Sequence, residues 1–154
     1  MIQTVLIDDE APARDELRYL LEKNHADTIN VVGEADTATS AISLITRVKP
    51  DLIFLDIHMH GLTGLELAQI IHDISPNSII VFATAYDEYA LKAFELHALD
   101  YIVKPIEEKR LADIVARAAK LHAALTGASH LATGTATSTT HDMGSNTATV
   151  TESA

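Results

Sequence analysis

The chain has 154 residues, 47% hydrophobic and 21% charged, with a formal net charge of −11 and no cysteine. This length and composition fit one globular domain, and the lack of cysteine excludes disulfides and thiolate chemistry. So acidic a chain is not expected to bind nucleic acid directly. It has no secretory signal, and no apolar run approaches the roughly 18 residues needed to cross a bilayer. We therefore expect a cytoplasmic protein without membrane contact.

Short apolar runs alternate with helical patterns up to about residue 125. Five runs predict strands, at Val5–Ile7, Val31–Val32, Leu52–Leu55, Ile79–Phe82 and Tyr101–Val103. After each run, apolar residues three and four positions apart predict a helix, around residues 17–21, 41–48, 65–71, 90–94 and 111–121. Strict alternation predicts an α/β, doubly wound fold: a five-stranded parallel sheet in the flavodoxin-like order 2-1-3-4-5, with five helices.

The composition changes at the end of the chain. Residues 126–154 include 13 Ser or Thr and no Lys, Arg or aromatic residue. Such a segment buries too little apolar surface to offset its ordering entropy. We therefore expect one domain over residues 1–125 and a flexible, Ser/Thr-rich tail over residues 126–154.

Charged and hydroxyl side chains follow four of the predicted strands. Asp8 and Asp9 follow the first, Asp56 the third, Thr84 ends the fourth and Lys104 follows the fifth. In a doubly wound sheet, ligands bind beyond the carboxyl ends of the strands. Each residue alone is commonly a helix cap or a solvated surface charge. Their joint position at one sheet edge indicates a site.

This set of residues suits phosphate chemistry. Clustered carboxylates repel one another unless a cation lies among them, and Mg²⁺ prefers oxygen ligands. Asp56 would then act as a nucleophile that forms an acyl phosphate. Lys104 would neutralise phosphoryl oxygens, since phosphoryl transfer depends mainly on positioning and charge stabilisation.

Four sequence blocks resemble the signature blocks of response-regulator receiver domains. The blocks are Val5–Glu10; Leu55-Asp56 with Met59 and Gly61 after it; Ala83–Ala85; and Tyr101–Pro105. The resemblance as a whole covers about residues 2–125. The resemblance implies that Asp56 is phosphorylated and that Mg²⁺ is the cofactor, held by Asp8, Asp9, Asp56 and the main-chain carbonyl of His58.

The same resemblance implies roles for further residues. Thr84 would be the switch hydroxyl, Tyr101 the switch aromatic and Lys104 the phosphoryl-binding lysine. His58 and Tyr86 would tune hydrolysis of the acyl phosphate, and the Lys104–Pro105 peptide bond would be cis. His60 departs from the family, which usually has proline there, and we expect a looser loop after Asp56.

The expected function is that of a phosphorylation-activated signalling switch, not an enzyme beyond its own phosphorylation and dephosphorylation. The phosphoryl group would come from a sensor histidine kinase, a phosphotransfer protein or a small phosphodonor. Finer blocks, such as Asp9–Arg14 and Thr84–Phe94, are similar to receivers that precede a LytTR-type DNA-binding domain. No such domain follows here, so DNA binding is not carried over; a free-standing and a truncated regulator both remain open.

Three alternatives are weighed against this function. A Mg²⁺-dependent phosphatase with an aspartyl nucleophile usually has two aspartates two positions apart after the first strand, whereas Asp8 and Asp9 are adjacent. A receiver that no longer uses phosphorylation would not need the complete set of site residues. A transition-metal site at His58 and His60 lacks a third ligand at a recognisable spacing.

One surface is a candidate for self-association. Five of the 11 basic residues fall between Lys104 and Lys120 in an otherwise acidic chain. The simpler interpretation is a solvated helix face. We favour a phosphorylation-dependent homodimer. Its face would consist of the helix around residues 90–94, the strand Tyr101–Val103 and the helix around residues 111–121. Arg117 or Lys120 of one copy would face Asp100 or Glu95 of the other.

Overall fold

The computed structural model describes residues 1–85, 93 and 95–127. The chain divides into two compact units, Met1–Ala119 and Lys120–Ala154. Of the second unit, residues 120–127 are described, and they are helical. The predicted tail lies outside the described residues from residue 128 onward. No helix among the described residues is long and apolar enough to span a membrane.

The first unit alternates strands and helices. Its elements are β1 (Ile2–Ile7), α1 (Ala11–Asn24), β2 (Ile29–Ala35), α2 (Ala38–Val48), β3 (Leu52–Leu55), α3 (Gly64–Ile74), β4 (Ile79–Thr84), β5 (Asp100–Val103) and the helical residues 108–119. The structure thus describes four of the five predicted helices. The helix predicted around residues 90–94 lies outside the described residues, apart from the buried Ala93.

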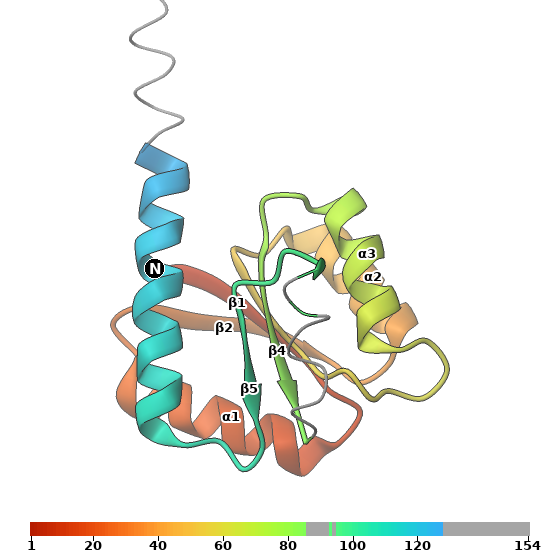
Figure 1. The fold of residues 1–154 in the computed structure, drawn as a ribbon, viewed down its shortest axis with the longest axis horizontal. Helices are drawn as coiled ribbons and strands as arrows, with labels where there is room; N and C mark the ends of the chain where they lie inside the picture. The colour runs from red at the N-terminus through yellow and green to blue at the C-terminus, as the bar shows by residue number, and fades with distance from the viewer. Residues whose placement is uncertain (86–92, 94, 128–154) are drawn as a thin grey trace, which may run out of the picture. The chain divides into compact units, whose positions relative to one another are not determined.

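All five strands form one parallel sheet in the order β2-β1-β3-β4-β5, which confirms the predicted fold class and strand order. β2 is longer than its apolar centre predicted, because its pairing with β1 runs from Ile29 to Ala35 through the exposed Asn30. Within the first unit, α2 and α3 lie on one face of the sheet, whereas α1 and residues 108–119 lie on the other (Figure 1).

Side-chain alternation along the strands fills both faces of the sheet. On β3, Ile53 and Leu55 pack on the side of α2 and α3, while Leu52 and Phe54 pack on the side of α1. All four side chains are fully buried. A sheet covered on both faces exposes only its edges and strand ends, so polar chemistry belongs at the strand ends.

Candidate functional site

The site lies at the carboxyl edge of the sheet, and strand register builds it. Ile7 pairs with Leu55, so Asp8 and Asp56 leave adjacent strands side by side. The Asp56 main-chain N–H donates to the Ile7 carbonyl at 2.9 Å. On the other side, Thr84 pairs with Val103, and the N–H of Lys104 donates to the Thr84 carbonyl at 2.7 Å.

Lys104 reaches across this edge to the acidic residues. Its Nζ lies 2.6 Å from Oδ2 of Asp8 and 3.9 Å from Oδ2 of Asp56. Thr84, at the end of the strand between them, is fully buried. The fold therefore brings together Asp8, Asp56, Thr84 and Lys104, which the sequence places on four separate strands.

The acidic loop after β1 offers a set of metal-ligand atoms. One carboxylate oxygen from each of Asp8, Asp9 and Glu10 lies within 4.8 Å of the others. Oδ1 of Asp8 accepts the main-chain N–H of Glu10 at 2.9 Å, which holds the turn. These donors are hard oxygens, the type that Mg²⁺ prefers. These donors fit Mg²⁺ in kind. The group contains the implied ligands Asp8 and Asp9, includes Glu10, which was not implied, and does not include Asp56.

Asp56 has an unusual electrostatic environment. Its pKa is raised from the ordinary 3.8 to about 7. Burial raises this pKa most, Asp8 and Asp9 also raise it, and Lys104 and the N–H of His58 lower it. The His58 N–H lies 3.4 Å from Oδ1 of Asp56. Lys104 thus lowers the pKa of Asp56 by less than burial and the neighbouring carboxylates raise it. A cation bound here would lower this pKa further and favour the ionised, nucleophilic form of Asp56.

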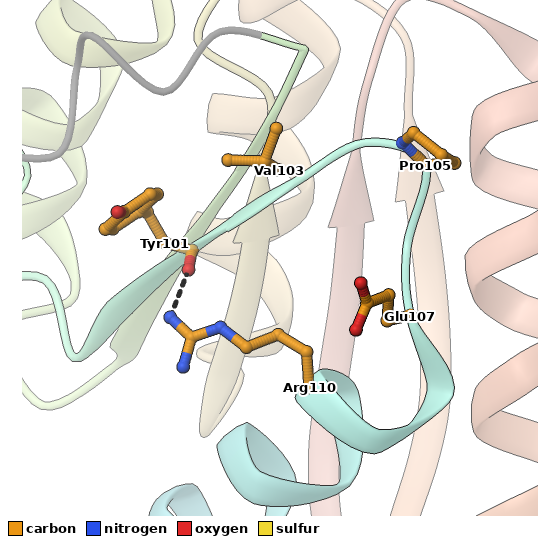
Figure 2. Close-up of a pocket in the computed structure, with 5 residues that line it drawn as sticks. All are labelled: Tyr101, Val103, Pro105, Glu107 and Arg110. Carbon is orange, nitrogen blue, oxygen red and sulfur yellow. Dashed lines mark hydrogen bonds between the residues drawn. The ribbon is translucent and has the colours of Figure 1, made fainter.

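Tyr101 lies on β5, at some remove from the acidic loop. It is half-buried, and Arg110 stands over its ring at 5.9 Å from the centroid. Figure 2 shows the Arg110 guanidinium directed at the Tyr101 carbonyl, 2.9 Å away, beside a pocket that also includes Val103, Pro105 and Glu107. The Lys104–Pro105 peptide bond is cis. Tyr86 lies outside the described residues.

His60 is in contact with an acidic residue of the site. Its Nδ1 lies 2.7 Å from Oδ2 of Asp9. The contact joins the loop after β3 to the loop after β1, although the imidazole is 98% exposed. The looser loop that we expect without proline stays a prediction. No sequence signal indicated this contact, because His60 lies in a loop, whose path hydrophobic periodicity does not predict.

Gly64 also has a role that its sequence context did not suggest. A Cβ on Gly64 would lie 2.0 Å from the carbonyl oxygen of Asp56 and 2.7 Å from the Cα of Ile57. The first residue of α3 therefore packs directly against the main chain of Asp56. Thr63 caps this helix by accepting the N–H of Glu66. Only glycine allows this close approach.

Arg14 is a second contact that local patterns did not reveal. Its Nη1 donates to the main-chain carbonyl of Asp8 at 2.6 Å, and its Nε donates to Glu34 Oε1 at 3.0 Å. In the sequence, Arg14 stands out only as the last residue of the block Asp9–Arg14. The structure places it against the acidic loop.

The fold and this set of residues define a class of protein, and comparison with known families identifies the same class. Residues 4–116 match the response regulator receiver domain. The chain therefore belongs to the receiver domains of response regulators, the signal-transduction proteins of two-component systems.

Individual relatives agree. The chain is 47% identical over 111 residues to the sensory transduction protein LytT of Bacillus anthracis. This match covers 72% of this chain and 44% of LytT. It is 50% identical over 111 residues to the transcriptional regulatory protein BtsR of Salmonella typhi, covering 72% and 45%. The chain spans about half the length of the curated relatives it matches, and the match covers their receiver part.

A solved structure shows the same fold. The response regulatory domain of protein mrkE from Klebsiella pneumoniae is 34% identical, with a TM-score of 0.72, over 79% of this chain and 98% of that domain.

Proposed function

We propose that this chain is a phosphorylation-activated switch that accepts a phosphoryl group on Asp56 in a Mg²⁺-dependent reaction. The observation that carries the proposal is the arrangement of Asp56 between Asp8 and Lys104 at one sheet edge. The donor would be a sensor histidine kinase, a phosphotransfer protein or a small phosphodonor.

In this reaction a carboxylate oxygen of Asp56 attacks phosphorus, and the bond from phosphorus to the donor breaks. The leaving group keeps the bonding electrons and takes a proton from solvent. Asp8, Asp9, Asp56 and the His58 carbonyl would hold Mg²⁺, which neutralises phosphoryl oxygens when bound. Lys104 would move from Asp8 toward the new phosphoryl oxygens and stabilise their charge.

The switch would pass through Thr84 and Tyr101. An acyl phosphate adds acceptor oxygens, and the Thr84 hydroxyl would turn to donate to one of them. Tyr101 would then fill the space vacated near β4 and β5. His58 and Tyr86, each two positions after a site residue, would set how fast water hydrolyses the acyl phosphate.

Intact-mass measurement tests the phosphorylation. With Mg²⁺ and a small phosphodonor, the wild-type mass should rise by one phosphoryl group, and Asp56→Asn should not change. Asp73→Asn, an exposed aspartate on α3, is the matched control and should label like wild type. Labelling of Asp56→Asn to the wild-type extent would refute the assignment, and steady turnover of a phosphomonoester would favour a phosphatase instead.

The coupling has its own test. Thr84→Ala should still gain one phosphoryl group, but the chemical shifts of Tyr101 and its neighbours on β5 should no longer change on phosphorylation. If the chemical shifts of Thr84→Ala change on phosphorylation as they do in wild type, Thr84 does not couple phosphorylation to Tyr101.

We also propose a phosphorylation-dependent homodimer through the face that includes β5 and residues 108–119. The structure bears on which charges could pair between the two copies. Oδ2 of Asp100 already binds Arg117 of the same chain at 2.6 Å, and Oδ1 binds Arg110 at 2.8 Å. An intermolecular pair between Arg117 and Asp100 would first require these bonds to break, so the dimer would use other charges on this face.

A further inference from the structure

Arg14 connects three elements around the acidic loop. It lies in the first turn of α1, donates from Nη1 to the Asp8 carbonyl at the end of β1, and donates from Nε to Glu34 on β2. Its side chain is 17% exposed. A guanidinium donates in a rigid plane, so two bonds to different elements determine its orientation.

The bond to the Asp8 carbonyl acts on the peptide that joins Asp8 to Asp9. Because the peptide unit is planar, holding this carbonyl restricts the backbone direction at Asp9 as well. The Asp8 side chain is held separately, by the Glu10 N–H on Oδ1 and by Lys104 on Oδ2. Arg14 thus holds the loop through the main chain of Asp8 and not through its carboxylate.

We propose that Arg14 is a positioning residue that sets the spacing of the Asp8 and Asp9 carboxylates for a divalent cation. The adjacent carboxylates of this loop repel one another, and this repulsion favours a more open loop in the absence of a cation. The bond from Arg14 keeps the loop against α1 and β2. This inference rests on the proposed Mg²⁺-dependent phosphorylation of Asp56.

The charge of Arg14 and its geometry have opposite effects on cation binding. A positive charge near the loop repels Mg²⁺, whereas the bond to the loop backbone favours it. Glu34 binds both Arg14 at 3.0 Å and Arg18 at 2.7 Å, and Arg18 also binds Glu22, so these four side chains together carry no net charge and their field at the loop is small. The geometric effect therefore dominates, and loss of Arg14 weakens Mg²⁺ binding.

Arg18 provides a matched control. It lies on the same helix and donates from Nε to Oε2 of the same Glu34 at 2.7 Å. Its other bond goes to Glu22, away from the acidic loop. Arg18→Gln therefore removes an equal charge and a bond to the same carboxylate, but no bond to the Asp8 backbone.

The test is a Mg²⁺ titration of the full chain without phosphodonor, followed by NMR. We expect Arg14→Gln and Arg14→Lys both to bind Mg²⁺ about tenfold more weakly than wild type, as is typical when a residue behind a metal ligand is lost. Arg18→Gln should bind like wild type. In metal-free protein, the amides of Asp9 and Glu10 should exchange with solvent faster in both Arg14 variants.

Phosphoryl uptake separates positioning from chemistry. In Arg14→Lys, the Mg²⁺ concentration for half-maximal uptake should rise, while the rate at saturating Mg²⁺ stays within about twofold of wild type. Unchanged or tighter Mg²⁺ binding in Arg14→Gln would overturn the inference, as would full rescue by Arg14→Lys, which would mean that only charge matters.

Two outcomes remain distinct. If wild type takes up no phosphoryl group, the proposed function fails, while the Mg²⁺ titration still decides the role of Arg14. If wild type is phosphorylated and Arg14→Gln matches it in every Mg²⁺ measurement, only this inference fails. Circular dichroism checks folding, and Arg14→Lys, the milder change, decides the matter if Arg14→Gln does not fold.

Discussion

The amine of Lys104 lies 2.6 Å from Oδ2 of Asp8 but 3.9 Å from Oδ2 of Asp56. Lys104 therefore bonds to a carboxylate that would hold the cation, and stands beside the proposed nucleophile without a short contact to it. This geometry gives one side chain two opposing effects: it competes with a cation for Asp8 and is available to a phosphoryl group on Asp56.

Lys104→Met should separate these two effects. Without the amine, Oδ2 of Asp8 becomes free for the cation, so Mg²⁺ should bind about threefold to tenfold more tightly. Phosphoryl uptake at saturating Mg²⁺ should nevertheless be about tenfold slower or more, because a cation that stabilises the transferred group is lost. A Mg²⁺ titration and a rate measured by intact mass check both parts. Weaker Mg²⁺ binding together with unchanged uptake would contradict this account.

The raised pKa of Asp56 predicts a pH-dependent stability in metal-free protein. The folded state holds a proton on Asp56 up to about pH 7, whereas the unfolded chain releases it near 3.8. Between these values the folded state binds more protons, so this group's contribution to the free energy of unfolding falls as the pH rises. Asp56→Asn removes the titration.

Denaturant unfolding with EDTA, from pH 4 to 8, measures this effect. Asp56→Asn should become progressively more stable than wild type as the pH rises, by on the order of 2–4 kcal/mol above pH 7. Mg²⁺ should stabilise wild type at pH 8 and reduce the difference. Parallel pH curves for the two proteins would show that Asp56 titrates normally.

Gly64→Ala should disturb the fold and the site together. The added methyl group meets the main chain of Asp56, so the start of α3 has to shift. We expect a loss of about 2–3 kcal/mol in the free energy of unfolding and slower phosphoryl uptake. Gly61→Ala is the control: its φ of +83° makes alanine strained there, but nothing lies within 4 Å of the new Cβ. That variant should lose about 1–2 kcal/mol, and equal losses in the two variants would argue against the close-approach explanation.

Arg117 should contribute to stability through Asp100. The Asp100 side chain is 7% exposed, and Arg117 binds its Oδ2 and the Leu99 carbonyl. Arg117→Gln leaves that oxygen without its charged partner while Arg110 still binds the other, so we expect a loss of about 1–2 kcal/mol. Arg47→Gln, at an exposed position on α2, should change stability little. Equal stability of the two variants would mean that the Arg117 contact is not maintained in solution.

The ion pair between Arg117 and Asp100 also affects how the proposed dimer should be tested. Light scattering before and after activation with beryllofluoride, which mimics the phosphoryl group, should show a mass increase in wild type. A charge reversal at Arg117 would disturb the fold as well as the face, so Lys109→Glu, in the basic stretch before Arg110, is the better control. A monomer in both states, at about 100 μM, would argue against the dimer.

The sequence alone determined the sheet and the positions of the site residues along it. The apolar runs at residues 52–55 and 79–82 lie within the buried strands β3 and β4, because strands covered on both faces must be apolar throughout. Parallel strands end at one edge. Asp8, Asp56 and Lys104 follow strands and Thr84 ends one, which was enough to predict that they lie together. This prediction needs only strand order and direction, which the alternating pattern supplies.

Only the tertiary structure decided which groups support that edge. The contacts of Arg14 with Asp8, of His60 with Asp9 and of Gly64 with Asp56 join different elements. They depend on how far a helix lies from a strand end and on where each side chain points. Hydrophobic periodicity records which face of an element is buried, but not these distances or directions. The chemistry at the strand ends is therefore readable along the chain, whereas the contacts that position it exist only once the elements are packed.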